Sequence, residues 1–135
     1  DSLDQTYNGN SYFNTFGGNP VSAAAAHSVL DILEEDNLIE EAGQVGSYLK
    51  KQLKKTLEEN ESVVEIRGKG LFLGIELDDP SKTAKAMEDM MHQGVLVGKT
   101  GPINSVIKLR PPMTFKKEHA DLLVDKINQC LRMIS

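Results

Sequence analysis

The chain contains 135 residues and carries a formal net charge of −5 at pH 7, with 39% hydrophobic and 26% charged residues. This size and composition predict a globular domain with a modest hydrophobic core. The acidic balance argues against non-specific binding to nucleic acid, which requires an excess of lysine and arginine. No apolar run approaches the roughly 20 residues of a membrane-spanning helix. The single cysteine, Cys130, excludes an internal disulfide and favours a reducing compartment.

Residues 1–14 are polar and lack a sustained hydrophobic period, so we expect them to form a loop. The chain begins at Asp1, without an initiator methionine, a signal sequence or a transit-peptide composition. We therefore expect it to be a piece of a longer protein. A cytoplasmic location is expected, with the mitochondrial matrix as the alternative.

The first helix is expected over residues 20–34. Asn19 is a suitable N-cap because its side chain accepts a hydrogen bond from a backbone amide of the first turn. Pro20 fits the first helical position, where no amide donor is needed. Four alanines at 23–26 favour a helix and allow another element to approach closely. The expected buried edge of this helix consists of Val29, Leu30 and Leu33.

A second helix is expected from about residue 37 to residue 60. Asn37 and Glu40 form a capping-box pattern at its start. Apolar residues then recur every three or four positions, which predicts one buried stripe. The residues of this stripe are Leu38, Ala42, Val45, Leu49, Leu53 and Leu57.

The pattern then changes to strands. Two apolar runs, 63–66 and 71–77, are separated by Arg67-Gly68-Lys69-Gly70, whose glycines mark a bulge or a turn. The two runs are therefore either a hairpin or one long bent strand. Two further short strands are expected at 95–97 and 106–109, with a turn at Gly101-Pro102 between them.

Two helices accompany these strands. Asp79 and Pro80 predict an N-cap and first turn for a helix over 80–93, which Gly94 ends. Its expected inward residues are Ala84, Met87 and Met91. The last helix is expected over 115–133, with Thr114 as N-cap. Its expected buried stripe consists of Ala120, Leu123, Val124, Ile127, Cys130, Leu131 and Ile134.

The element order predicts an α+β fold: two N-terminal helices followed by β-β-α-β-β-α. We expect a mainly antiparallel sheet with the helices of 80–93 and 115–133 on one face. The expected organisation is an interdomain segment over 1–19, two linking helices over 20–60 and a small domain over 61–135.

Common catalytic constellations do not assemble in this sequence. His27, His92 and His119 fall on three different expected helices, and Cys130 stands at no metal-ligand spacing from them. We therefore expect no metal site and assign no catalytic residue within the chain.

The stretch from Thr15 to Pro20 is the strongest candidate for ligand binding. Gly17 and Gly18 allow the backbone to turn tightly or to approach a ligand, and the Thr15 hydroxyl stands just ahead of the expected helix. This arrangement favours an anion such as phosphate. The alternative is a capped junction between a loop and a helix.

Four motifs carry a resemblance to a known family. Thr15-Phe16-Gly17-Gly18-Asn19-Pro20, Arg67-Gly68-Lys69-Gly70-Leu71, Gly74-Ile75-Glu76 and Lys108-Leu109-Arg110-Pro111-Pro112-Met113 occur in its order and at its approximate spacing. The chain resembles the class III aminotransferases of the fold-type I pyridoxal-phosphate enzymes over about residues 8–131. The nearest branch contains alanine–glyoxylate aminotransferase 2 and ethanolamine-phosphate phospholyase.

The resemblance implies a composite active site. In the family, a large domain binds pyridoxal 5′-phosphate through a lysine that lies in a segment missing from this chain, so the chain alone should not transaminate. The family resemblance further implies a homodimer in which Thr15 contacts the cofactor phosphate of the neighbouring subunit, with Asn14 as a second candidate. The alternative for Thr15 is a hydroxyl that bonds within its own turn.

A substrate-binding position is also implied. Many class III aminotransferases carry, before Pro-Pro, an arginine that binds the substrate carboxylate; the matching residue here is Lys108. Arg110 follows two places later, on the same face of a strand. Either Arg110 replaces the family arginine or Lys108 holds the anion as a point charge. Alternatively, both are surface charges.

The expected function is therefore the C-terminal domain of a class III aminotransferase, with the missing large domain and a second subunit as partners. The lysine at position 108 favours a phospholyase of phosphorylated amino alcohols as an alternative. A stand-alone small domain used for binding or scaffolding, without catalysis, is the other alternative.

Overall fold

The computed structural model describes residues 14–134, so the loop expected over 1–14 lies outside the described residues except for Asn14. The chain divides into two compact units, with the boundary between Asp36 and Asn37. This boundary differs from the one expected near residue 60, because the second helix packs on the sheet that follows it. Each unit is described by itself below.

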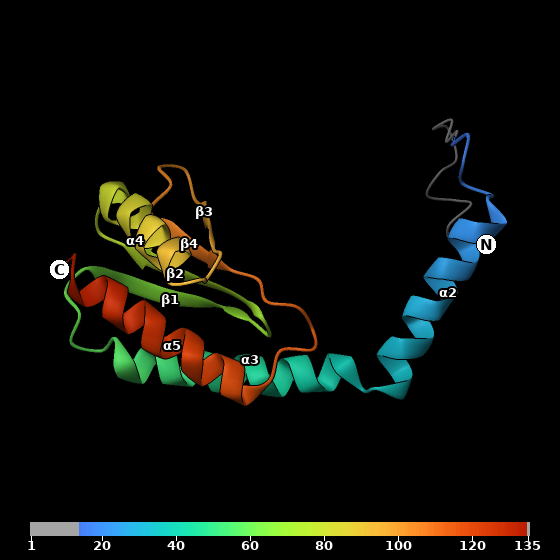
Figure 1. Ribbon diagram of the computed structural model, residues 1–135, viewed down its shortest axis with the longest axis horizontal. Coiled ribbons are helices and arrows are strands. Elements are labelled where there is room, and N and C mark those ends of the chain that lie inside the picture. Colours follow the sequence, from blue (N-terminus) through green and yellow to red (C-terminus); the bar gives the residue numbers. More distant parts are fainter. Residues whose placement is uncertain (1–13, 135) are drawn as a thin grey trace, which may run out of the picture. The chain divides into compact units, whose positions relative to one another are not determined.

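The first unit contains helix α2, Pro20–Glu35 (Figure 1). Its N-cap is confirmed: Asn19 Oδ1 accepts hydrogen bonds from the amides of Val21, at 2.9 Å, and Ser22, at 3.3 Å. None of its residues is buried, and Leu30 is 60% exposed. The expected buried edge of this helix is therefore not formed by contacts within the described residues.

The second unit begins with helix α3, Leu38–Thr56, whose expected apolar stripe is confirmed as buried. The expected capping box is wrong. Asn37 has a left-handed backbone with φ 48°, and its side chain accepts no hydrogen bond from the helix. Instead, Asn37 Nδ2 donates to Glu40 Oε2 at 3.1 Å. The helix also ends before residue 60, where a turn closes between the Asn60 amide and the Leu57 carbonyl.

Four strands form one sheet in the order β1-β2-β4-β3, and each neighbouring pair is antiparallel. They are β1 (Val63–Lys69), β2 (Phe72–Leu77), β3 (Gly98–Thr100) and β4 (Val106–Leu109). The first two runs thus form a hairpin, which settles the alternative left open by the sequence. The register places Ile66 opposite Ile75 and Ile75 opposite Ile107, so these apolar side chains share one face.

Helices α3, α4 and α5 pack against that apolar face and build the core with it. The α+β fold with helices on one face of an antiparallel sheet is confirmed, with α3 joining the two helices expected there. Figure 1 shows α5 running alongside α3. The Tyr48 hydroxyl donates to Asp121 Oδ1 at 2.6 Å, and Lys116 forms an ion pair with Glu41, so polar contacts also join these two helices.

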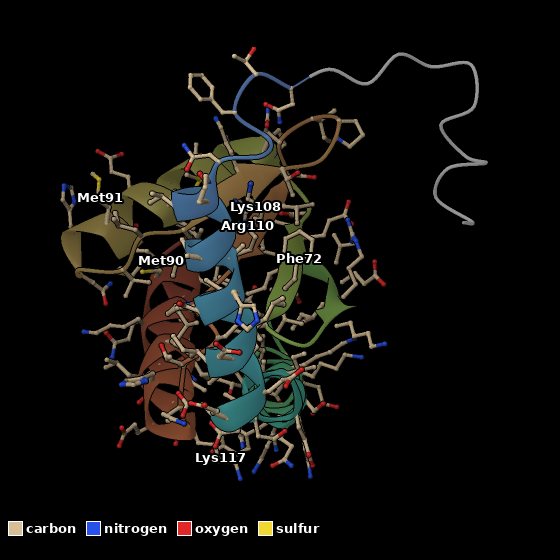
Figure 2. All side chains as sticks on the ribbon, turned by 90° about the vertical axis from the view of Figure 1, so that its right-hand side faces the viewer. Phe72, Met90, Met91, Lys108, Arg110 and Lys117 are labelled. Atoms are coloured by element: carbon tan, nitrogen blue, oxygen red, sulfur yellow. The ribbon has the colours of Figure 1, made fainter. Side chains whose placement is uncertain are left out.

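Helix α4, Pro80–His92, starts as expected: Asp79 Oδ1 accepts from the Ser81 amide at 2.7 Å. The expected inward face is wrong by about one residue. The buried residues are Thr83, Ala86 and Met90, whereas Ala84 and Met91 are exposed and Met87 is half-buried. Figure 2 shows Met90 on the side of α4 toward α5 and Met91 projecting outward. The methionines at 87, 90 and 91 are compatible with either choice of buried face for α4. The burial of Thr83 shows which face points inward.

Two other boundaries differ from expectation. The third strand comprises 98–100 rather than 95–97, where Val95 and Val97 pack against the core from an irregular segment. Helix α5, Lys117–Arg132, has Lys116 as its N-cap rather than Thr114. The cause is a turn that the Phe115 amide closes on the Pro112 carbonyl. The expected stripe of α5 is confirmed: six of its residues are buried and Ile134 is half-buried against the core.

Candidate functional site

The expected phosphate-binding segment forms a tight turn ahead of α2. Asn14 Oδ1 accepts from the Phe16 amide at 3.1 Å, and the Asn14 carbonyl accepts from the Gly17 amide at 3.2 Å. Thr15 is exposed, and within residues 14–134 neither its hydroxyl nor its amide forms a hydrogen bond. The Gly18 amide is equally available within these residues. Three donors therefore remain at this turn, a set whose chemistry fits phosphate oxygens.

The N-terminus of α2 contributes less to anion binding than its sequence suggests. Asn19 occupies the amides of Val21 and Ser22, which would otherwise be free at the start of the helix. The candidate site in this unit is therefore the turn with Thr15, and Asn14 mainly shapes that turn. A Cβ at Gly17 would lie 3.2 Å from Asn14 Cβ, so the glycine lets the asparagine side chain fold across the turn.

In the second unit, the face of the sheet opposite the helices carries most of the polar side chains of the strands. One row across this face consists of Arg67 on β1, Gly74 on β2, Lys108 on β4 and Gly98 on β3. Lys108 and Arg110 thus lie where the sequence placed them, on one face at the end of β4. Figure 2 labels both side chains, and Arg110 lies by Phe72 of β2.

The cations on this face differ in their pairing. Arg67 forms ion pairs with Glu76 and Glu65, and these hydrogen bonds, that of Glu76 first, raise the pKa of Arg67 above its ordinary value. Lys108 and Arg110 form no ion pair within residues 14–134. Their positive charges are therefore available to an anionic ligand, as is that of Lys69 on β1, which lies on the same face and also forms no ion pair within these residues.

Lys108 and Arg110 lean in opposite directions. The Arg110 guanidinium carbon lies 5.9 Å from the centre of the Phe72 ring, toward β2. Lys108 lies over Gly98 on β3, because a Cβ built on that glycine would be 3.0 Å from Lys108 Cε and 3.6 Å from Nζ. Since β4 lies between β2 and β3, the two cations diverge across the sheet.

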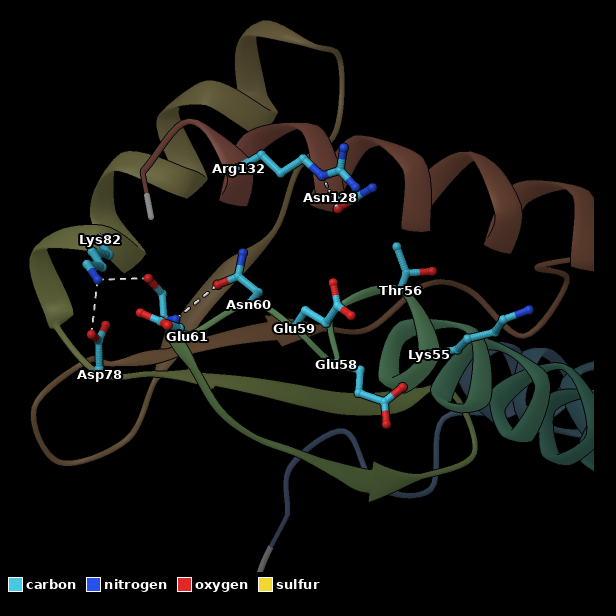
Figure 3. A pocket seen from close by; sticks show the side chains of 11 residues that line it. Lys55, Thr56, Glu58, Glu59, Asn60, Glu61, Asp78, Lys82, Asn128 and Arg132 are labelled. Atoms are coloured by element: carbon cyan, nitrogen blue, oxygen red, sulfur yellow. Dashed lines mark hydrogen bonds and ion pairs between the residues drawn. The ribbon is translucent and has the colours of Figure 1, made fainter.

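A hollow of about 650 Å³ opens elsewhere in this unit, between the end of α3, the start of α4 and the end of α5 (Figure 3). It is lined by charged groups of both signs, several of which bond to one another. Lys82 Nζ donates to Ser62 Oγ at 2.7 Å and pairs with Asp78 at 3.0 Å. Such internal pairing makes it a weaker anion site than the sheet face.

A further hollow of about 510 Å³ has a largely apolar lining, including Leu96, Phe115 and Leu122, and reaches Arg110 at its edge. Within residues 14–134, no group of three or more histidine, cysteine, aspartate or glutamate side chains is arranged to hold a metal ion. None of the helices in the same stretch is long and apolar enough to cross a membrane.

The cations were identified from the sequence, but Phe72 and Gly98, against which they lie, were not. Gly74 was noted only as part of a motif. The signal that reveals these residues is the strand register, which the sequence does not display. The Arg67–Gly70 motif proves to be structural: Gly70, with φ 54°, forms the hairpin turn, and the Gly68 carbonyl accepts from Lys50 Nζ at 3.0 Å.

The sequence model of the aminotransferase class-III family matches residues 2–131. The chain belongs to the class-III aminotransferases. The "alanine–glyoxylate aminotransferase 2 homolog 2, mitochondrial" of Arabidopsis thaliana is 43% identical over 126 residues, which are 87% of this chain and 26% of that protein. An "alanine–glyoxylate aminotransferase 2-like" protein of Drosophila melanogaster is 40% identical over 93% of this chain and 27% of its own.

A solved structure agrees with this class-III assignment. An Arthrobacter phospholyase in complex with phosphoethanolamine superimposes with a TM-score of 0.88 at 39% identity, covering 96% of this chain and 33% of the other. The chain thus spans about a quarter to a third of the length of these relatives. The cofactor of this class-III family is pyridoxal 5′-phosphate.

Proposed function

We propose that this chain is the C-terminal part of a pyridoxal-phosphate-dependent aminotransferase. The observation that carries the proposal is the pair of unpaired cations, Lys108 and Arg110, on the open sheet face of a class-III aminotransferase fold. Charge-assisted hydrogen bonds from such groups hold a carboxylate or phosphate more strongly than neutral donors do. In this role Lys108 binds the anionic end of the amino substrate, and Arg110 adds a second positive charge on the same face of the sheet.

The cofactor, when bound, supplies an electron sink for the amino substrate. This chain contributes Thr15, whose hydroxyl and amide donate to the cofactor phosphate, together with the Gly18 amide. In the complete homodimer this phosphate belongs to the neighbouring subunit. By resemblance to the family, the lysine that holds the cofactor lies in the large domain outside this chain, so we expect the 135-residue chain alone to be inactive. The proposed location is the cytoplasm or the mitochondrial matrix.

Lys108 favours a second candidate function, a phospholyase acting on a phosphorylated amino alcohol. An arginine offers a planar fork that matches a carboxylate, whereas a lysine offers a compact point charge. The lysine at this position therefore suits a phosphate at least as well as a carboxylate. The similar Arthrobacter protein is described as a phospholyase in complex with phosphoethanolamine, which supports the same reading.

Substrate profiling of the complete enzyme separates the two candidates. With alanine and glyoxylate, an aminotransferase forms pyruvate and glycine without releasing phosphate. With phosphoethanolamine, a phospholyase releases inorganic phosphate, ammonia and acetaldehyde. If the complete enzyme converted neither alanine with glyoxylate nor phosphoethanolamine, both assignments would be contradicted.

The role of Thr15 is tested by titrating the cofactor into the complete apoenzyme. A hydrogen bond to a charged group contributes roughly 1.5–3 kcal/mol, so Thr15→Ala is expected to raise the cofactor Kd by about 10- to 100-fold. Thr15→Ser retains the hydroxyl and is the matched control. An unchanged cofactor affinity in Thr15→Ala would show that this residue does not hold the phosphate.

A further inference from the structure

Lys108 occupies an unusual position in the sheet, because the residues opposite it on both neighbouring strands are glycines. Gly74 of β2 pairs with it on one side and Gly98 of β3 pairs with it on the other. No neighbouring side chain in this row confines the lysine. The question is therefore what determines the direction of its ammonium group.

The two glycines do not play the same part. A Cβ at Gly98 would lie 3.0 Å from Lys108 Cε, closer than almost all real contacts of this kind. A Cβ at Gly74 would instead meet Val106 Cγ1 at 2.9 Å, and no atom of Lys108 lies within 4 Å of it. The lysine side chain thus fills the space left by the missing side chain of Gly98, whereas Val106 occupies the corresponding space at Gly74.

The backbone gives no reason for a glycine at position 98. Positive φ angles occur at Gly68, Gly70, Gly94 and Gly101 but not at Gly98, which lies in an ordinary antiparallel strand. An alanine there is compatible with the backbone, so its first consequence is a collision with the side chain of Lys108. The far end of a lysine is flexible, and it would move rather than the strand.

We propose that Gly98 is a positioning residue for Lys108: it leaves room for the lysine side chain to lie over β3 and present its ammonium group to the anionic end of the substrate. The inference rests on the proposed function, in which Lys108 binds that anion. Phe72 holds Arg110 on the opposite side, so the two cations stay apart and Lys108 acts as a single point charge. The shared chemistry is an anionic group, a carboxylate in alanine or a phosphate in phosphoethanolamine.

The test compares Gly98→Ala, Lys108→Ala and the double variant in the complete enzyme. Gly98→Ala is expected to raise the KM for the accepted substrate about tenfold with little change in kcat, a coupling typical of residues in contact. In the Lys108→Ala background, Gly98→Ala should have no further effect. Calorimetry with inorganic phosphate gives a readout independent of turnover and should show the same pattern in Kd. Gly43→Ala, a glycine with open space around it on α3, is the control.

The outcomes separate the inference from the proposed function. If Lys108→Ala leaves KM and phosphate affinity unchanged, the substrate role of Lys108 fails, and the inference fails with it. If Lys108→Ala weakens binding but Gly98→Ala does not, only the positioning role of Gly98 is overturned. An effect of Gly98→Ala that persists without the lysine side chain overturns it equally.

Folding does not obscure the result. If Gly98→Ala lowers the thermal midpoint, Lys108→Ala should restore it in the double variant, because truncating the lysine makes room for the new methyl group. A double variant as unstable as Gly98→Ala would show that the alanine collides with something other than Lys108, which contradicts the proposal. The arms with alanine and with phosphoethanolamine then identify which anion Lys108 receives.

Discussion

Gly46 of α3 and Gly70 of the hairpin turn touch through their backbones: a Cβ on Gly46 would lie 2.1 Å from the carbonyl carbon and oxygen of Gly70. Such an overlap cannot be relieved by rotating a side chain. The helix and the turn can approach this closely only because position 46 has no side chain. Leu71, next to Gly70, is buried against Ala42 and Val45 of the same helix.

This contact predicts opposite effects for two glycines of the same helix. Gly46→Ala forces α3 and the hairpin apart and is expected to destabilise the chain by about 1–3 kcal/mol or more. Gly43 is exposed with no atom within 4 Å of its virtual Cβ, so Gly43→Ala should stabilise the helix by about 0.5–1 kcal/mol. Urea unfolding followed by circular dichroism measures both. If Gly46→Ala and Gly43→Ala changed the free energy of unfolding in the same direction, the close contact between Gly46 and Gly70 would be contradicted.

Adjacent methionines of α4 test the corrected phase of that helix. Met90 is fully buried, so Met90→Ala removes core packing and should cost about 2–5 kcal/mol. Met91 is 52% exposed, and Met91→Ala should change the free energy of unfolding by less than about 0.5 kcal/mol. The same unfolding assay compares them. If Met91→Ala lowered the free energy of unfolding more than Met90→Ala does, the result would instead support the buried face expected from the sequence.

The stacking of Arg110 on Phe72 predicts a specific role for the aromatic ring. Phe72 is 58% exposed, which makes packing a minor part of its contribution. Phe72→Leu removes the aromatic face that the guanidinium contacts. The present orientation of Arg110 should then lose about 0.5–1 kcal/mol of stabilisation. The KM for the accepted substrate of the complete enzyme is expected to change two- to fivefold. Phe72→Tyr keeps the ring and should behave like the unaltered protein.

Tyr48 gives a prediction for alkaline pH. The hydrogen bond to Asp121, followed by desolvation and the charge of that carboxylate, raises the pKa of Tyr48 above 10.0. Because the folded-state pKa is higher than the unfolded one, this contribution to stability is fully present below pH 10 and is lost as the pH rises through the folded-state pKa. Absorbance titration at alkaline pH should show one tyrosine ionising late.

The control for this titration is Asp121→Asn. The amide cannot carry the negative charge that opposes ionisation, so the pKa of Tyr48 should fall toward its ordinary value. Tyr48→Phe should abolish the late step. A late step that survives in Tyr48→Phe would assign it to another residue.

The sequence predicted those features that depend on one element at a time. The stripes of α3 and α5 were identified correctly because their apolar residues recur without ambiguity, as at Leu49, Leu53 and Ile127. The phase of α4 was not, since buried Thr83 carries no apolar signal and Met91 does. Asn37 was assigned a cap because the pattern does not report its left-handed backbone.

Features that depend on contacts between several elements could not be predicted from the sequence. Lys108 and Arg110 were placed on one strand face, which follows from their spacing. Their divergence was not foreseen, because it depends on strand register: Gly98 comes opposite Lys108 only once β3 pairs with β4, and Phe72 meets Arg110 only across β2. Contacts between distant segments decide such details.

The division between Asp36 and Asn37 has a practical consequence for dissecting the polypeptide. A truncation that begins at Asn37 keeps Leu49 and Leu53 in the hydrophobic core, packed against the sheet. One that begins at residue 61 removes α3 and its core residues. The shorter product would expose Ile66 and its neighbours to solvent and aggregate. Anyone excising this region for crystallography or labelling should place the cut ahead of α3.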